Sequence, residues 1–277
     1  MRVSCLGSGS RGNSVLVEAG RTRVLVDAGF SGRSLARRLA ALDRDPAGID
    51  ALLVTHEHRD HTSGAGIAAR RWGWPLLMTR ATARACDGLL QGSESLVAFE
   101  AGSQFELGDL TVSAVPTCHD AADPVAFVVT ERSSGLTVGI ATDLGRATVP
   151  VRAALAGCQF LVLEANHDEV RLRDSPYPWP VKQRIGGSRG HLSNRLAGEL
   201  AADLLHPDLG GVLLAHLSVE CNAPELALAE VRREIRRARR DWRGGLAVAG
   251  QDAPTPLIDV AAAARRGEAQ LPLFPGR

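Results

Sequence analysis

The chain has 277 residues, of which 45% are hydrophobic and 23% charged, a composition that excludes intrinsically disordered and collagen-like proteins. Lys and Arg number 32 against 31 Asp and Glu, so the net charge of +1 neither indicates nor excludes a polyanionic partner. The five cysteines are widely spaced without a C-x-x-C pair, which argues against a disulfide framework and a thiolate zinc site. Without a signal peptide or a long apolar span, we expect a cytoplasmic protein that does not bind a membrane.

Periodicity along the chain predicts an α/β protein. Apolar or alternating runs predict strands at residues 2–6, 14–19, 22–27, 51–54, 96–98, 104–107, 110–115, 125–131, 136–141, 159–163, 211–215 and 245–250. Helical spacing predicts helices at residues 31–42, 64–72, 80–90, 147–156, 191–205 and 223–240. Helices interspersed through two batches of strands favour two packed mixed sheets covered by helices, an αβ/βα four-layer sandwich.

Domain boundaries follow from the same pattern. We expect one domain over residues 1–260 and a flexible tail over residues 261–277. Within the domain, residues 174–190 are rich in Pro and Gly, and we expect them to form a long irregular segment of functional importance.

The sequence His56-x-His58-x-Asp60-His61 follows the apolar run at residues 51–54. Neutral imidazoles and carboxylates are ligands for zinc, manganese and iron, and two adjacent metal ions can activate a water molecule and clamp a phosphodiester. The spacing therefore predicts a metal site at the end of a buried strand. The alternative is a histidine-rich surface loop.

Further ligand-type residues follow later apolar runs, at His119, Asp143 and His216. This order of motifs resembles that of the metallo-β-lactamase superfamily. The secreted β-lactamases of that superfamily carry a cysteine at the position where this chain has Asp143. The resemblance implies two divalent cations, zinc or manganese with iron also compatible, and the early aspartate Asp27 as a group that orients the ligands. It assigns His56, His58 and His119 to one cation and Asp60, His61 and His216 to the other, with Asp143 bridging them.

Four local motifs are similar to those of the YycJ (WalJ) group of bacterial nucleases: residues 6–14, 119–124, 163–168 and 190–194. The resemblance implies a phosphodiesterase, a DNA exonuclease linked to repair, with DNA rather than RNA as the substrate. In that mechanism a metal-bridging hydroxide attacks phosphorus in line, and we predict that Asp60 and His191 take part in catalysis. A thioester hydrolase of the glyoxalase II type is the alternative enzyme, because the same metal core serves both.

Substrate contacts are predicted around a helix start. The segment combines an imidazole, His191, with two residues that commonly begin helices, Ser193 and Asn194. The exposed N–H groups at a helix start favour a phosphate. His191 is a candidate acid for the leaving group or a candidate phosphate clamp. An ordinary helix cap is the alternative. Asn166 and His167 are further candidates that a buried hydrogen-bonded role would also explain, and Asn13 lies in a Gly-Ser turn that is also compatible with a tight hairpin.

The tail contains Gln270-Leu271-Pro272-Leu273-Phe274. It resembles the peptide by which bacterial repair proteins dock onto the replication sliding clamp, and this implies that Gln270, Leu271, Leu273 and Phe274 bind that partner. The alternatives are a tail that packs on its own domain and a clamp-associated adaptor without catalytic activity.

Overall fold

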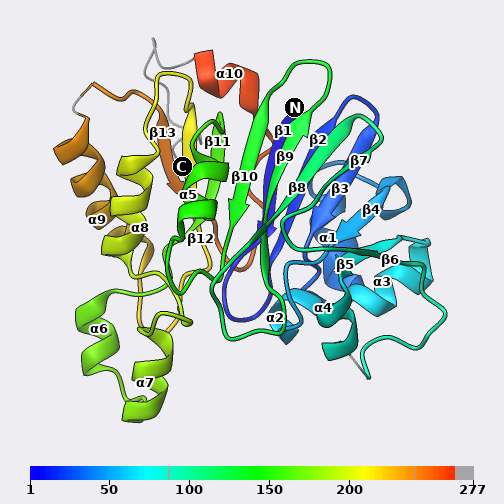
Figure 1. Ribbon diagram of the computed structural model, residues 1–277, viewed down its shortest axis with the longest axis horizontal. Helices are drawn as coiled ribbons and strands as arrows, with labels where there is room; N and C mark the ends of the chain where they lie inside the picture. The colour runs from blue at the N-terminus through cyan, green and yellow to red at the C-terminus, as the bar shows by residue number, and fades with distance from the viewer. Residues whose placement is uncertain (87, 240, 266–277) are drawn as a thin grey trace. The chain divides into compact units, whose positions relative to one another are not determined.

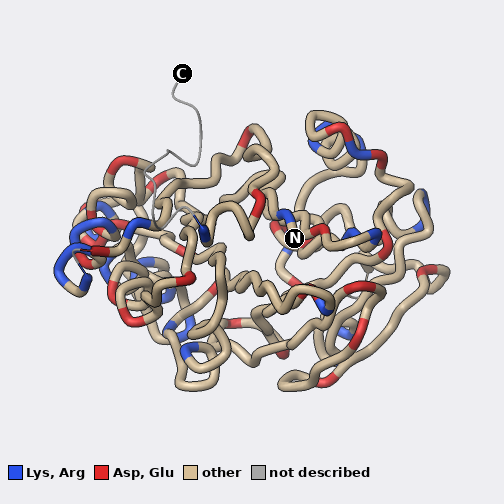
Figure 2. Tube along the Cα trace, turned by 90° about the horizontal axis from the view of Figure 1, so that it is seen from above, with Lys and Arg blue, Asp and Glu red and all other residues tan. Residues whose placement is uncertain are grey.

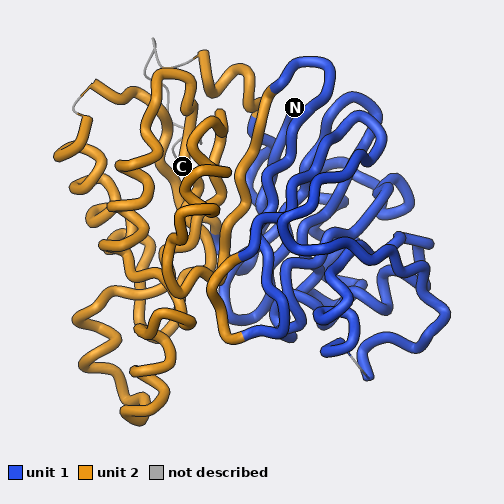
Figure 3. Tube along the Cα trace, in the orientation of Figure 1, with its two compact units in different colours: residues 1–116, 121–135, 250–258 blue, residues 117–120, 136–249, 259–277 orange. Residues whose placement is uncertain are grey.

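The computed structural model describes residues 1–86, 88–239 and 241–265. They form two compact units, shown in different colours in Figure 3. Unit 1 comprises residues 1–116, 121–135 and 250–258, and unit 2 comprises residues 117–120, 136–249 and those from 259 onward. The strands belong to two sheets of seven, which confirms the predicted α/β class with two mixed sheets.

Unit 1 contains the first sheet and three strands of the second (Figure 1). The order of the first sheet is β14 (Ile258–Asp259), β1 (Arg2–Gly7), β2 (Ser14–Ala19), β3 (Thr22–Val26), β4 (Ala51–Leu53), β5 (Leu76–Thr79) and β6 (Leu96–Phe99). Strands β1 to β3 are antiparallel and β3 to β6 are parallel. The other three strands, β7 (Gln104–Leu107), β8 (Leu110–Pro116) and β9 (Val125–Glu131), form an antiparallel meander.

The helices of unit 1 connect the parallel strands, because a parallel pair needs a crossover connection. They are α1 (Gly32–Ala40), the 3-10 turn η1 (Pro46–Gly48), α2 (Arg59–Thr62), α3 (Ala65–Trp72) and α4 (Arg80–Ala85). Ser31 caps α1 by accepting from the Ser34 amide, and the fully buried Leu35 and Leu39 place this helix in a core with Leu25 and Leu52 of the sheet. Burial of such side chains stabilises each by about 1.5–3 kcal/mol.

Unit 2 contains four parallel strands: β10 (Thr137–Ala141), β11 (Phe160–Glu164), β12 (Gly211–Ala215) and β13 (Gly245–Val248). Their nearly uninterrupted apolar sequences are typical of strands that are covered on both faces. Its helices are α5 (Val149–Leu155), α6 (Glu169–Asp174), α7 (Trp179–Ile185), α8 (Asn194–Asp203), α9 (Pro224–Ala238) and α10 (Val260–Arg265). Helices α8 and α9 lie side by side (Figure 1).

The prediction that residues 174–190 are irregular was wrong, because α7 occupies seven of them, from Trp179 to Ile185. Pro178 stands at the N-cap and Pro180 in the first turn, where no intrahelical N–H is needed, so these prolines start the helix rather than prevent it. The sequence patterns also missed β5 and α6. Helix α10 covers residues 260–265, the beginning of the predicted tail, while residues 266–277 lie outside the described part of the chain. The division into one domain and a tail stays a prediction.

Candidate metal centre

In unit 1 the predicted ligands lie at the carboxyl ends of two neighbouring parallel strands. Asp27 directly follows β3, and His56 is the third residue after β4. Because parallel strands end at the same edge of a sheet, Asp27 and the loop from His56 to His61 meet there. The imidazole of His56 lies against those of His58 and His61, with ring centroids 4.6 and 4.3 Å apart.

Asp27 organises this ligand loop. Its Oδ2 lies 2.7 Å from Nδ1 of His61 and accepts from the Thr55 hydroxyl at 2.8 Å, while Oδ1 accepts from the Thr55 amide at 2.8 Å. A carboxylate on Nδ1 fixes the tautomer and the orientation of the ring, so that Nε2 is the nitrogen that can bind a metal. These contacts support the orienting role of Asp27, which stays a prediction.

Asn13 lies against the ligands of unit 1. Its backbone N–H donates to the Asp60 carbonyl at 2.7 Å, and its side-chain amide lies 3.3 Å from Asp60 Oδ2 and 3.2 Å from His61 Nε2. The amide oxygen accepts from the Ser8 hydroxyl and the Gly9 amide at 2.7 and 2.9 Å. Asn13 therefore ties the Gly-Ser turn to the ligand loop, and its predicted contact with substrate stays a prediction.

In unit 2 three acidic or imidazole side chains leave adjacent parallel strands at one edge. Asp143 follows β10, Glu164 ends β11 and His216 follows β12 directly. Asp143 Oδ1 lies 3.4 Å from His216 Nδ1 and 3.5 Å from His191 Nδ1. One ligand atom from each of Asp143, Glu164, His191 and His216 lies within 4.8 Å of the others, which is a spacing that suits a metal ion.

Glu164 is a member of this cluster that the sequence analysis did not predict as a site residue. Its side chain is fully buried, and Oε1 lies 2.8 Å from Nδ1 of His191 and 3.0 Å from Nδ1 of His216. Its Oε2 accepts from the amides of Leu144 and Leu192 at 2.8 and 3.0 Å. Burial raises the pKa of Glu164, but the charge of His191 and the hydrogen bonds from both histidines outweigh burial and hold it well below its usual value. The glutamate at the end of an apolar strand was the available signal.

His119 and His191 complete the cluster in unit 2. Nδ1 of His119 lies 2.9 Å from the Gly190 carbonyl, and its Nε2 lies 3.2 Å from Asp120 Oδ1 and 3.6 Å from Asp143 Oδ1. Burial lowers the pKa of His119, which keeps the ring neutral as a metal ligand must be. Burial also acts to lower the pKa of His191, but the charge of Glu164 and its hydrogen bond raise it above the ordinary value.

The donor set fits a divalent cation. Nδ1 of His61, His119 and His216 faces an acceptor that holds the ring in place, which is the arrangement found around histidines that bind metals through Nε2. Asp27, Asp143 and His216 also have positive φ angles of 62°, 57° and 56°, a conformation that non-glycine residues adopt at a cost. Each of the three lies at the end of a strand, where this conformation turns the chain away from the strand direction.

Other predicted substrate residues are used by the fold. Asn166 donates to the His216 carbonyl at 2.9 Å, and Asn194 and Asn222 form a reciprocal pair of amide hydrogen bonds at 2.9 Å. Ser193 caps α8 and donates to Glu169 at 2.9 Å. Ser193 therefore acts as a helix cap, and Asn166 and Asn194 are buried and hydrogen-bonded. Contact between these side chains and a substrate stays a prediction. The clamp-motif residues Gln270, Leu271, Leu273 and Phe274 lie outside the described residues.

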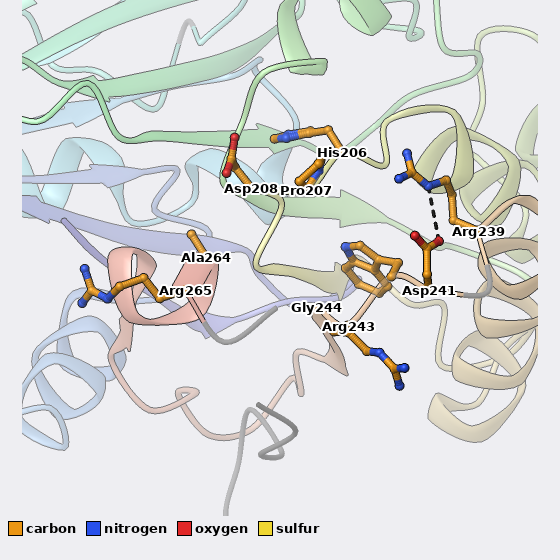
Figure 4. A pocket seen from close by; sticks show the side chains of 10 residues that line it. His206, Pro207, Asp208, Arg239, Asp241, Arg243, Gly244, Ala264 and Arg265 are labelled. Atoms are coloured by element: carbon orange, nitrogen blue, oxygen red, sulfur yellow. Dashed lines mark ion pairs between the residues drawn. The ribbon is translucent and has the colours of Figure 1, made fainter. Parts of the chain in front are cut away.

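A cavity of about 540 Å³ in unit 2 lies away from the ligand cluster (Figure 4). Its lining includes His206 to Asp208, which precede β12, and Trp242 to Gly244, which precede β13. It therefore lies at the amino ends of β12 and β13, whereas Asp143, Glu164 and His216 lie at the carboxyl ends of β10, β11 and β12. Arg239 and Asp241 form a 3.5 Å ion pair at its wall.

The chain resembles known proteins over most of its length. The sequence profile described as the Beta-lactamase superfamily domain matches residues 22–216. Exodeoxyribonuclease WalJ of Streptococcus pneumoniae is 36% identical over 233 residues, which are 82% of this chain and 85% of that protein. Exodeoxyribonuclease YycJ of Bacillus anthracis is 32% identical over 233 residues, covering 83% of this chain and 88% of that protein.

Solved structures agree on the fold. The metallo-beta-lactamase fold protein YhfI of Bacillus subtilis has a TM-score of 0.68 at 19% identity, covering 92% of this chain and 98% of that one. The short form of human tRNase Z has a TM-score of 0.63 at 14% identity, covering 92% and 98%. The chain belongs to the beta-lactamase superfamily and, within it, to the family of WalJ and YycJ. It is a metal-dependent hydrolase, and the predicted metallo-β-lactamase fold is confirmed.

Across the described residues, no helix combines the length and the apolar character needed to cross a bilayer. Acidic and basic residues alternate along much of the trace in Figure 2. On α9, Arg233 and Arg237 pair with Glu234, and Arg233 also pairs with Glu230. Much of the positive charge of this helix is therefore balanced locally.

Proposed function

We propose that the protein is a metal-dependent deoxyribonuclease that removes nucleotides from DNA ends. The observation that carries the proposal is the carboxylate-anchored ligand set, His61 on Asp27 and His216 on Glu164, in a chain 36% identical to an exodeoxyribonuclease. The proposal includes a role in DNA repair, as the resemblance implies, and the cytoplasmic location expected from the sequence.

The resemblance assigns the metal ligands. His56, His58 and His119 are proposed to bind one divalent cation, Asp60, His61 and His216 a second, and Asp143 both. Zinc and manganese suit these imidazole and carboxylate ligands, and iron is also compatible. When bound, such cations supply Lewis acidity toward a phosphodiester and lower the pKa of water to near neutrality.

Side chains around the proposed metal ligands are expected to contact the substrate, donate a proton and position the imidazoles. His191 is suited to contact substrate, because its side chain is 18% exposed while those of His119 and His216 are 1% and 5% exposed. Its Nδ1 is held by Glu164, so Nε2 is the atom that can donate a proton to the leaving oxygen or a hydrogen bond to a phosphate oxygen. Asp60 and His119 take part through the ligand set, and Asp27 and Glu164 position the imidazoles.

A nuclease assay tests the proposal. Purified protein with manganese is expected to shorten a duplex DNA labelled at the 5′ or the 3′ end, and Asp60→Ala and His119→Ala are each expected to abolish cleavage. The matched control is Asp252→Ala, which removes a carboxylate that is 81% exposed. Undiminished cleavage by either ligand variant contradicts the proposal, and so does turnover of lactoylglutathione by a protein that leaves DNA intact.

We further propose that Gln270, Leu271, Leu273 and Phe274 bind the replication sliding clamp. An apolar Leu-Phe anchor with a hydrogen-bonding Gln is a compact recognition element of the kind that dominates binding energy. Deletion of residues 268–277 is expected to abolish binding of the full chain to purified clamp in a pull-down while DNA cleavage is retained. Clamp binding that survives the deletion contradicts this assignment.

A further inference from the structure

A second cavity in unit 2, of about 560 Å³, borders the ligand cluster through His191. Helices α6 and α7 and the beginning of α8 supply its walls. The residues that matter for its chemistry are His167, Trp179, Lys182, His191 and Arg195. His191 connects the cavity to the cluster, because its Nδ1 lies 2.8 Å from Glu164 Oε1 and 3.5 Å from Asp143 Oδ1.

His167 indicates that the cavity is built to bind something. Its side chain lines the cavity and the residue is 3% exposed, yet Nδ1 has no hydrogen-bond partner within the described residues. A buried polar atom without a partner costs free energy, and a hydrogen bond from this ring to a ligand or a water would offset part of that cost. Burial lowers the pKa of His167 to about 4, so the ring is neutral at physiological pH and keeps one N–H to donate.

The charges that line the cavity favour an anion. Three cations line it, Arg173, Lys182 and Arg195, of which Arg173 pairs with Asp174 and Arg195 pairs with Glu169 and Glu199. Glu169 is occupied by Arg195 at 3.1 Å and by the Ser193 hydroxyl at 2.9 Å. Nζ of Lys182 donates instead to a backbone carbonyl, that of Arg173, at 2.6 Å, so its charge is not neutralised by a carboxylate at that contact.

Trp179 adds a planar apolar surface. It stands at the first position of α7, lines the cavity and is 65% exposed, so its ring is accessible to a ligand. Aromatic side chains beside cationic ones are the arrangement by which proteins hold single-stranded nucleic acid, because every base has a face that stacks. A cation, a neutral imidazole donor and an indole surface in one cavity match the phosphate and the base of a nucleotide.

We propose that this cavity is a nucleotide subsite, which holds one unpaired nucleotide of the DNA strand next to the bond that is cleaved. Its base stacks on Trp179, and its phosphate accepts hydrogen bonds from Lys182 and His167. The proposal rests on the proposed function, and it assigns to the α6–α7 segment the separation of the strand end from its complement.

Binding of a product nucleotide tests the subsite without requiring cleavage. The full chain loaded with manganese is titrated calorimetrically with thymidine 5′-monophosphate, with thymidine and with deoxyribose 5-phosphate. Trp179→Ala is expected to weaken the monophosphate about 10-fold and leave deoxyribose 5-phosphate unchanged, because stacking alone is lost. Lys182→Ala is expected to weaken both phosphates and leave thymidine unchanged.

Two controls keep the outcome interpretable. Trp179→Phe retains a stacking face and is expected to bind the monophosphate with most of the affinity that Trp179→Ala loses. If the indole had only a structural role, Trp179→Ala would change the affinities for all three ligands alike. Arg132→Ala removes a cation that is 49% exposed in unit 1, and is expected to bind all three ligands as the natural chain does.

Unchanged affinity for the monophosphate in both Trp179→Ala and Lys182→Ala overturns the subsite. Binding of the phosphate at the metal ions alone would give this result. A protein that cleaves DNA but gives this result retains its proposed function and loses the subsite. A protein that binds the nucleotide as predicted but does not cleave DNA retains the subsite and loses the function.

Discussion

Glu164 Oε1 lies 3.0 Å from Nδ1 of His216, a residue 52 positions further along the chain. The contact exists because β11 and β12 are parallel and paired in a register that sets Glu164 opposite Ala215, the residue before the histidine. Asp27 holds His61 in the same way in unit 1. In each unit, therefore, a buried carboxylate contacts Nδ1 of a proposed metal ligand and restricts the rotation of its imidazole.

Replacement of Glu164 by Gln is expected to lower the affinity for manganese or zinc by about 10- to 100-fold, because the amide cannot accept from both imidazoles and hold both backbone amides. Competition with a chromophoric chelator measures the affinity. Glu106→Gln, at a side chain that is 63% exposed, serves as the control and is expected to change nothing. Equal metal affinity in Glu164→Gln and the natural chain rules out the positioning role.

Asp27→Asn is expected to weaken metal binding by a similar factor of about 10 to 100, because the carboxylate that fixes the His61 ring is lost. The Thr55 amide and hydroxyl also donate to Asp27, so the variant is expected to loosen the ligand loop as well. Metal content after dialysis, measured by inductively coupled plasma spectrometry, checks this. Full metal retention after dialysis shows instead that His61 holds its orientation without the charge.

Gly29 allows the chain to pass close to the ligand loop. A Cβ at this position would lie 1.7 Å from the Asp60 carbonyl oxygen and 2.7 Å from the Asn13 nitrogen. Gly29→Ala is therefore expected to displace Asp60, with a cost of about 1–3 kcal/mol in the free energy of unfolding and a loss of metal affinity. Gly157→Ala is the matched control, since a Cβ there meets nothing within 4 Å. Urea unfolding of the two variants compares them, and equal midpoints refute the close approach.

Glu18 predicts a pH-dependent contribution to stability. Its side chain is 4% exposed and lies 2.5 Å from Arg44, 3.0 Å from Arg2 and 3.1 Å from Arg23. Burial raises its pKa, but the hydrogen bond from Arg44 and the three positive charges outweigh burial and lower it below the ordinary 4.5. Because the folded pKa is depressed, the stabilisation is complete above the unfolded value and is lost as the pH falls through the folded value.

Glu18→Gln is accordingly expected to lower the free energy of unfolding by about 1–3 kcal/mol at neutral pH, and the difference from the natural chain is expected to shrink in acid. Urea unfolding in buffers from pH 7 to pH 3 measures it. Glu100→Gln removes a carboxylate that is 77% exposed and pairs with an exposed Arg80, so it is expected to have almost no effect. A Glu18→Gln difference that stays constant with pH contradicts the depressed pKa.

The proposed metal ligands could be selected from the sequence because they are marked locally, and their roles stay a prediction. His56, His58, Asp60 and His61 lie within six residues after an apolar run, and His119, Asp143 and His216 each follow a strand. The residues just after parallel strands lie at the same edge of the sheet, however that sheet packs in the fold. Their proximity can therefore be predicted without knowing the packing. The α/β class followed from the same alternation of apolar runs and helical spacing.

Only the tertiary structure decided what surrounds these ligands. The pairing of β11 with β12 placed Glu164 against His216, and the folding of residues 168–195 into α6, α7 and the start of α8 brought Trp179 and Lys182 to the cavity of His167. These relationships join residues that share no spacing in the chain, so no local pattern marks them. Buried polar side chains form hydrogen bonds with the groups that lie next to them in the folded protein. Which groups lie there depends on the packing of the whole fold.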